Sequence, residues 1–435
     1  MVEEDCTKYR PKCTLVCSLT LDGDIQLEEL RELFERNVLE ATLQSSSSLK
    51  FNPAQIRYPE LTQYQVDFMG YRFWKEDPNF RIENHVFEMV LQDSNLVAIH
   101  QEAINKLYYR NRSPWEIILI RFNDGNEILP KTLIIARFHH SMADARSMIK
   151  LLVECLGGQP LTVANPQQKE ENFVKELLYY TTFPIQFLSS IGKLILNSAA
   201  NLDHKWRADV FSNEKETQKF SHVIGLSPKL LLDDIKKIAK KHNGTTSSVI
   251  MAIVSGAVGK FMDEKFMKKS IAGYILPKPD HPPTLTTHAC VGAVLLPTDE
   301  KSASKRLLKC NTEFNSLKKS KLDRYNDFVG WQSGAIPNLL RNTMVRNAYF
   351  PIGITNIAGE ANGLSIAGRN CSEFIFSAGT LRGCQGVLLC VSSYMEFLRI
   401  SVIAKNTIFD DIQVQKLANA IGDELTILKQ IVSAV

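Results

Sequence analysis

The nine cysteines of this 435-residue sequence include no Cys-x-x-Cys pair and none at zinc-ligand spacing from a histidine. Their odd number and irregular spacing argue against a disulfide scaffold and indicate reduced, structural thiols in a cytosol-facing protein. No secretory signal is visible in the first residues, which are polar and charged. The sequence also lacks a stripe of lysines and arginines with interleaved aromatic residues, so no nucleic-acid partner is expected.

The composition is that of a globular protein. Hydrophobic residues make up 44% of the chain and charged residues 23%, and the formal net charge is only +4. The length is ample for two domains with cores of their own. We expect an N-terminal half over residues 1–162, an apolar crossover linker over 163–215 and a C-terminal half over 216–435.

Alternating and helical hydrophobic patterns occur in both halves, which predicts mixed α/β or α+β layers. In the N-terminal half we expect a strand over residues 13–21, a helix over 26–39, and a hairpin of strands 115–122 and 132–138. In the C-terminal half we expect helices from Ser227 (as N-cap, with Pro228 first), from Ser247 and from near Asp410. Strands are expected near residues 292–296, 352–357, 386–391 and 398–404.

The segment Phe138-His139-His140-Ser141-Met142-Ala143-Asp144 carries the strongest chemical signal. It follows the apolar run 133–136, which predicts a strand buried on both faces, and it precedes a predicted helix over 143–156. Because a neutral histidine can take a proton from a hydroxyl group, such a pair is typical of general-base catalysis. Adjacent residues in an extended chain project to opposite sides, so we expect one histidine to be catalytic and the other to support it.

Two other interpretations of this segment stay open. The two histidines are structural in the first, one buried and hydrogen-bonded and the other solvated. In the second, His140 and Asp144 bind a metal, although no third ligand stands at recognisable spacing. No cysteine is paired with a histidine in the sequence, so a cysteine nucleophile is not expected.

His139-His140-x-x-x-Asp144 is similar to the HHxxxDG signature of the coenzyme A-dependent acyltransferase superfamily. Further segments resemble its wax ester synthase/diacylglycerol acyltransferase (WS/DGAT) branch, and they occur in the same order. These segments are Phe73-Trp74 with Asp77, Phe80, Ile82 and His85-Val86; Ser113-Pro114-Trp115-Glu116-Ile117; Val294-Leu295-Leu296-Pro297-Thr298; and Ile354-Thr355-Asn356-Ile357-Ala358-Gly359. The D-F-G-W-G motif of the plant BAHD branch is absent from the sequence.

The sequence departs from the family pattern at four places. Ala145 stands where the signature has glycine, Ala358 where the family has proline, and Thr245-Thr246-Ser247-Ser248 where it has an N-D-V helix start. The strand end over residues 274–279 lacks the family's arginine. These departures indicate a divergent member whose substrate pocket differs.

The resemblance implies two chloramphenicol-acetyltransferase-like domains, with mixed sheets flanked by helices and an active-site tunnel at the domain interface. It assigns the general base to His140, a structural role to Asp144 and a supporting role to His139. Thr355 and Asn356 become candidates for binding the acyl carbonyl or oxyanion. Trp115, Ser247 and Ser248 are further substrate-binding candidates.

The function implied by the resemblance is acyl-CoA-dependent esterification of a fatty alcohol or diacylglycerol, which gives wax ester or triacylglycerol. Acyl-CoA is then a co-substrate, and no metal or bound cofactor is expected. One alternative is an acyltransferase acting on short-chain or specialised-metabolite alcohols. Another is a lipid-binding protein that keeps the fold without turnover.

The most apolar segment spans residues 173–200, where only Lys175, Glu176 and Lys193 are charged. Pro184 and Gly192 interrupt it, so it does not match an ordinary membrane-spanning helix. It fits a crossover packed on the enzyme body, an interfacial amphipathic element or a re-entrant hairpin. From the interfacial interpretation we expect peripheral or shallow association with the endoplasmic reticulum or lipid droplets.

Overall fold

The computed structural model describes residues 8–9, 13–41, 56–89, 95–122, 131–155, 181, 206, 221–268, 270–278, 281–282, 284–319, 336–337, 350–380 and 386–433. The N-terminal half contains β1 (Lys8–Tyr9), β2 (Thr14–Asp22), α1 (Leu27–Phe34), β3 (Gln63–Phe68), β4 (Tyr71–Glu76), β5 (Val86–Glu88), α2 (Leu96–Asn105), β6 (Tyr108–Tyr109), β7 (Trp115–Phe122), β8 (Lys131–His139) and α3 (Ala145–Cys155).

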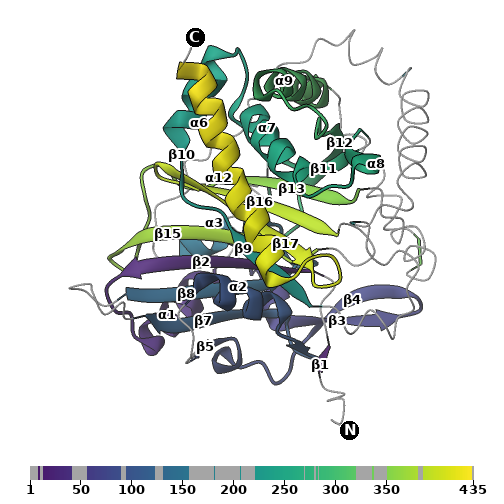
Figure 1. Cartoon of the computed structure of the whole chain (residues 1–435). Coiled ribbons are helices and arrows are strands. Elements are labelled where there is room, and N and C mark those ends of the chain that lie inside the picture. Colours follow the sequence, from purple (N-terminus) through teal and green to yellow (C-terminus); the bar gives the residue numbers. More distant parts are fainter. Residues whose placement is uncertain are drawn as a thin grey trace.

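The C-terminal half contains β9 (His222–Leu226), β10 (Leu230–Leu231), α6 (Leu232–Lys241), α7 (Thr246–Gly259), α8 (Glu264–Met267), β11 (Ile271–Pro277), β12 (Ala289–Leu295), α9 (Ala303–Lys319), β13 (Ile352–Ala358), β14 (Ser365–Ile366), β15 (Arg369–Ala378), β16 (Val387–Tyr394), β17 (Phe397–Lys405) and α12 (Asp411–Ser433). Figure 1 shows the two halves as two stacked layers.

The N-terminal sheet runs β14-β15-β2-β8-β7-β5 among the described residues. Strand β8 lies between β2 and β7 and pairs antiparallel with both. Its His139 is opposite Thr14 of β2, and its Phe138 is opposite Trp115 of β7. All of its residues after Lys131 are buried, as predicted from the apolar run. The predicted antiparallel pair β7 and β8 is therefore confirmed, while its turn over residues 123–130 lies outside the described residues.

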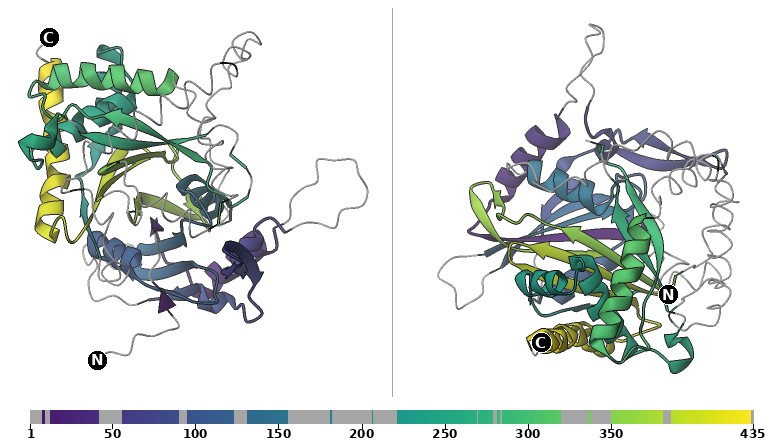
Figure 2. Two further views of the ribbon diagram at one scale, coloured as in Figure 1. Left: turned by 90° about the vertical axis from the view of Figure 1, so that its right-hand side faces the viewer. Right: turned by 90° about the horizontal axis from the view of Figure 1, so that it is seen from above.

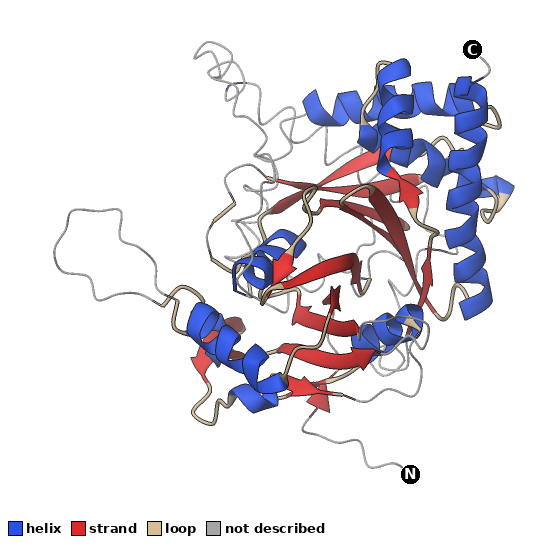
Figure 3. Cartoon of the chain, turned by 90° about the vertical axis from the view of Figure 1, so that its left-hand side faces the viewer, coloured by secondary structure: helices blue, strands red, loops and turns tan. Residues whose placement is uncertain are grey.

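The C-terminal sheet is mixed. Its order is β10-β17-β16-β13-β11-β12, with β9 also paired to β17, among the described residues. The pairs β11–β13 and β13–β16 are parallel, whereas β11–β12 and β16–β17 are antiparallel. Helices α6, α7, α9 and α12 lie on one side of this sheet (Figure 3). The expected mixed sheets flanked by helices are confirmed.

Strand β16 contributes to both hydrophobic cores, one on each face of the C-terminal sheet. Alternate side chains of a strand point to opposite faces. Val387, Leu389 and Val391 belong to the core beneath the C-terminal helices. Leu388 and Cys390 face the other way and belong to the core of the N-terminal sheet. Both faces of the C-terminal sheet are therefore covered along this strand, which explains its continuous apolar sequence.

Two strands of the C-terminal half, β14 and β15, lie in the N-terminal sheet. Strand β15 pairs antiparallel with β2, with Phe376 opposite Cys17 and Ala378 opposite Leu15. It places residues 371–378 next to residues 15–21, and Figure 1 shows β15 beside β2. No strand was expected at this position from the sequence.

The predicted helix start at Ser227 is wrong. The Ser227 hydroxyl accepts a hydrogen bond from Ile400 N at 2.9 Å, so it fixes the chain to β17 instead of capping a helix. Leu230 and Leu231 then pair with Leu398 and Phe397 of the same strand. Helix α6 consequently begins only at Leu232. A tertiary backbone pairing thus overrides the local Ser-Pro signal.

The predicted C-terminal helix is confirmed. Gln413 N donates to the Asp410 carboxylate at 2.7 Å, which caps α12. In the left view of Figure 2 the helix runs along one side of the C-terminal half, and in the right view it is seen nearly end-on at the edge. Its buried face is formed by Val414, Leu417, Ile421, Leu425 and Leu428, the residues expected from the sequence.

The apolar segment 173–200 and the linker predicted over 163–215 lie outside the described residues, apart from Thr181 and Trp206. Among the residues that are described, no helix combines the length and the hydropathy needed to cross a membrane.

Candidate active site

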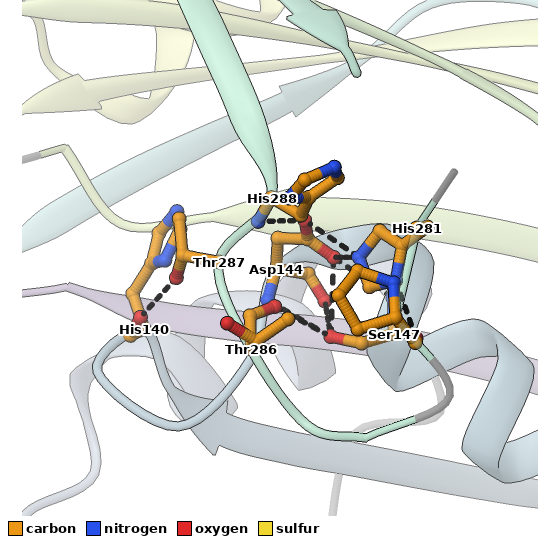
Figure 4. A network of polar contacts seen from close by, with 8 residues as sticks. His140, Asp144, Ser147, His281, Thr286, Thr287 and His288 are labelled. Atoms are coloured by element: carbon orange, nitrogen blue, oxygen red, sulfur yellow. Dashed lines mark hydrogen bonds and ion pairs between the residues drawn. The ribbon is translucent and has the colours of Figure 1, made fainter. Parts of the chain in front are cut away.

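His140 is the first residue after β8, and both halves hold its backbone. Its amide nitrogen donates to Cys13 O at 3.0 Å, which continues the ladder to β2. Its carbonyl oxygen accepts from the Thr287 hydroxyl at 3.3 Å, across to the C-terminal half. Figure 4 shows the His140 ring on the far side of Thr287 from Asp144. The strand end and Thr287 therefore fix the backbone from which this imidazole projects.

The environment of His140 favours its neutral form. Burial lowers the pKa of His140, and the Asp144 charge and the backbone of His140 and Ala143 oppose this only in part. Because its pKa lies below the ordinary histidine value, the ring is uncharged near neutral pH. A ring nitrogen is then available to accept a proton.

His139 has a different environment. Its side chain points into the N-terminal layer, where it is 8% exposed and meets the Tyr108 ring edge-on at 6.3 Å. Its Nδ1 accepts from Ser141 N at 3.1 Å and lies 2.7 Å from the Ser141 hydroxyl oxygen. These contacts stabilise the turn that follows β8, so the geometry separates the two adjacent histidines as the extended chain predicts.

Asp144 caps the start of helix α3. Its carboxylate accepts from Ser147 N at 2.8 Å, and the Ser147 hydroxyl accepts in return from Asp144 N at 3.1 Å. This reciprocal arrangement is a capping box, which satisfies two otherwise unpaired backbone donors. Ala145 is the first residue of the helix and does not have a positive φ. The position therefore needs no glycine, and this departure from the family signature leaves the backbone unstrained.

The same carboxylate joins the two halves. Both Asp144 oxygens lie 3.1 Å from His281 Nε2, and one of them accepts from His288 N at 2.8 Å. Asp144 N also donates to Thr286 O at 3.1 Å. Burial raises the pKa of Asp144, but the hydrogen bonds from His281, Ser147 N and His288 N outweigh it, and the net pKa is lowered. The carboxylate is therefore ionised, and Figure 4 shows it between the His281 ring and the segment 286–288.

The sequence did not reveal these partners of Asp144. His281 follows two residues after the strand end that lacks the family's arginine, and that missing cation was the only available signal. Ser147 could have been found, because Asp-x-x-Ser before an apolar run is a capping pattern. Within the described residues, no cluster of three or more His, Cys, Asp or Glu side chains is arranged to hold a metal.

The C-terminal candidates fall into two groups. Asn356 Nδ2 donates to the Ser247 hydroxyl at 3.4 Å, so β13 and the first turn of α7 meet at these two side chains. Thr355 precedes Asn356 on β13 and is 8% exposed. Ser248, in contrast, is the third residue of α7, and its hydroxyl accepts from Thr245 N at 2.8 Å in a capping box. The Ser248 hydroxyl is thus committed to the helix start.

Trp115 lies in the N-terminal core. It is 0% exposed, its ring stacks on His85 at 4.5 Å and on Phe34 at 4.9 Å, and its indole nitrogen donates to Leu61 O at 2.8 Å. A side chain with every face packed by protein has no surface left for a substrate. The structure places Trp115 in the packing that supports β7 and not among the groups around His140.

Sequence comparisons link the chain to one family. A family model described as the WS/DGAT C-terminal domain matches residues 290–429. The curated protein wax ester synthase/diacylglycerol acyltransferase 2 of Arabidopsis thaliana is 24% identical over 170 residues. That match covers 35% of this chain and 32% of the relative, so it spans only about a third of the relative's length.

Solved structures match nearly the whole chain. Wax ester synthase/diacylglycerol acyltransferase from Marinobacter aquaeolei has a TM-score of 0.56 at 15% identity, covering 99% of this chain and 96% of that one. Trichothecene 15-O-acetyltransferase from Fusarium sporotrichioides has a TM-score of 0.63 at 12% identity, covering 96% and 91%. At such identities the likeness establishes the fold alone, and it confirms the expected two-domain chloramphenicol-acetyltransferase-like class. The family model and the curated relative show that the chain is similar, over part of its length, to the wax ester synthase/diacylglycerol acyltransferase family.

Proposed function

We propose that this protein is an acyl-CoA-dependent O-acyltransferase that esterifies a lipid alcohol, either a fatty alcohol or a diacylglycerol. His140 is its general base. The observation that carries this proposal is the state of His140: a half-buried residue with a lowered pKa, whose backbone is held at a strand end by hydrogen bonds from both halves. The similarity to wax ester synthase/diacylglycerol acyltransferases supports the choice of substrate class.

In the proposed reaction, His140 takes the proton from the bound alcohol while the alcohol oxygen bonds to the thioester carbonyl carbon. The carbon–sulfur bond of the tetrahedral intermediate then breaks. The departing CoA thiolate receives the proton back from the His140 imidazolium, so no acyl-enzyme forms. We assign Thr355 and Asn356 to the acyl carbonyl, because amide and hydroxyl donors stabilise the charge that develops on this oxygen. Asp144 keeps the loop of His140 in place.

We further propose that the protein works at a lipid surface. Its long-chain acceptors are nearly insoluble in water, and one described element offers apolar side chains to such a surface. The β3–β4 hairpin extends from the body in Figure 1. By the pairing of its strands, Phe68, Met69 and Phe73 lie at or near its turn. These side chains are 62%, 82% and 51% exposed. Exposed aromatic and methionine side chains at a tip suit the headgroup boundary of a membrane or droplet.

Release of free CoA thiol from the purified protein tests the reaction. The assay combines acyl-CoAs of graded chain length with fatty alcohol or diacylglycerol, and it compares wild type with His140→Ala. We expect release that depends on both substrates and that is lost in the variant. His242→Ala, at the C-terminal end of α6 and away from the site, is the matched control and should behave as wild type.

Three outcomes would change the proposal. Release only with short acyl-CoAs and a polar alcohol would replace the lipid acceptor with the specialised-metabolite alternative. Binding of acyl-CoA without any release would identify a lipid-binding protein on the same fold. Equal release by wild type and His140→Ala would remove His140 from the chemistry.

A further inference from the structure

Both ring nitrogens of His281 face hydrogen-bond acceptors. Nδ1 lies 2.9 Å from the carbonyl oxygen of Pro282, and Nε2 lies 3.1 Å from each carboxylate oxygen of Asp144. A carbonyl oxygen and an ionised carboxylate can only accept. A neutral imidazole has one donor nitrogen and one acceptor nitrogen, so it satisfies only one side of this arrangement. The network is complete when His281 carries two protons.

The contact between His281 and Asp144 is buried, so the charge on His281 matters for the stability of the pair. The His281 side chain is 4% exposed and that of Asp144 is 10% exposed, so the pair is largely shielded from water. Titratable side chains from two segments face His281: Asp144, from the loop after β8, and His288, whose ring meets His281 edge-on at 5.4 Å. A buried carboxylate that lost its cation would keep only uncharged donors, which is a costly state.

We propose that His281 is a positioning residue that acts as an imidazolium. It ties the segment 281–288 of the C-terminal half to Asp144 and thereby fixes the loop and the carbonyl group of His140. The consequence for catalysis rests on the proposed function, whereas the protonated link itself does not.

The sign of the pH dependence follows from this protonation. A link that requires an added proton stabilises the fold at lower pH and loses this contribution as the pH rises. His140 has the opposite requirement, because it must be neutral to act as a base. Two histidines of one site thus need opposite protonation states, so kcat/KM should fall on both sides of a maximum. The acid limb belongs to His140 and the alkaline limb to His281.

The deciding experiment measures unfolding of the full chain by denaturant from pH 6 to 8.5, for wild type, His281→Gln and the control His242→Gln. Glutamine donates from only one end and carries no charge. Wild type should lose more stability than His281→Gln as the pH rises, and the control should follow wild type. Equal pH slopes for wild type and His281→Gln would overturn the proposal, whether or not either protein turns over substrate.

A rescue variant separates positioning from general stability. Arginine is a multiple donor that stays charged at every pH of the assay. His281→Arg should keep kcat/KM and lose the alkaline limb, whereas His281→Gln should lower kcat/KM roughly tenfold at pH 6.5. If the arginine variant does not fold, the ¹⁵N shifts of the His281 ring in wild type decide: two protonated nitrogens at pH 6.5 support the proposal, and one protonated nitrogen refutes it.

Discussion

The Nδ1 atom of His100 lies 2.7 Å from the hydroxyl oxygen of Ser377, although 277 positions separate the two residues. Nε2 of the same ring lies 2.8 Å from the hydroxyl oxygen of Ser18. One imidazole on α2 therefore contacts β15 and β2, the two strands that join the halves in one sheet. Burial lowers the pKa of His100 to about 4, so the ring is neutral near pH 7.

This contact predicts an acid-sensitive fold. The pKa of His100 is depressed in the folded state. Its contribution to the stability of the fold is therefore present above the pKa of the unfolded chain, near 6.5, and is lost as the pH falls. Between pH 7 and pH 5 the loss should be about 2 kcal/mol. Denaturant unfolding at both pH values measures it. His100→Gln should be less stable at pH 7 but should lose less between the two values; a parallel loss in both proteins would contradict this role.

Substitution of the two adjacent histidines should give unequal results. His140→Ala should reduce alcohol-dependent CoA release about 10²-fold to 10⁴-fold, because a general base contributes a factor of this size. His139→Ala should keep part of the activity and lower the melting temperature, because it removes the acceptor of Ser141 N. Rate assays and thermal melts of both variants check this, and the reverse ranking would move the base to His139.

Asp144→Ala should lower stability and rate together. It leaves His281 without its carboxylate partner and removes the cap of α3, and breaking a buried pair in this way costs about 3 kcal/mol. Asp144→Asn keeps an acceptor for the cap, so its stability and rate should lie between those of wild type and Asp144→Ala. Melting temperature and CoA release are measured on the same preparations. An unchanged melting temperature with a lost rate would indicate direct participation in the chemistry.

Trp115 should matter for stability and not for substrate binding. Trp115→Ala opens a cavity in the N-terminal core and should destabilise the fold by about 3 to 5 kcal/mol. Trp115→Phe keeps most of the packing but loses the hydrogen bond to Leu61 O, so its effect should be smaller. The KM for acyl-CoA of the phenylalanine variant should equal that of wild type. A raised KM at unchanged stability would restore the substrate-binding role.

Lipid binding is tested by flotation with liposomes. Wild type should float, and changing Phe68, Met69 and Phe73 to Ser should reduce the floating fraction. Leu308→Ser is the matched control, since this α9 side chain is 66% exposed and lies away from the hairpin.

A second variant with Phe183, Phe187 and Leu188 changed to Ser tests the apolar segment 173–200. Flotation of every variant alike would rule out both elements, and a wild type that stays at the bottom would remove the lipid surface itself.

Local patterns predicted the elements that carry the candidate base. The apolar run before His139, the helix after Asp144 and the heptad-like face of α12 are all signals within one element, and burial of that element alone decides them. The predicted helix start at Ser227 was wrong, because this segment pairs with the backbone of β17 instead of forming a helix.

Contacts between distant segments could not be predicted in the same way. Strand β15 alternates only weakly, with Arg369, Asn370 and Ser372 at its start, and its partner strand is more than 350 residues earlier in the sequence. The sequence around His281 does not predict its contact with the Asp144 carboxylate, which only the fold brings beside it. Both features depend on how the two layers are stacked, and no single segment of the sequence encodes that stacking.

The position of β15 determines which pieces of this chain can be produced separately. A fragment that ends before residue 365 would lack both β14 and β15, and the whole buried edge of β2 would be exposed. A bare strand edge of this kind pairs with other chains and aggregates. We therefore expect the N-terminal half to aggregate when it is expressed alone, and a split version of the protein to need co-expression so that the missing strand is supplied in trans.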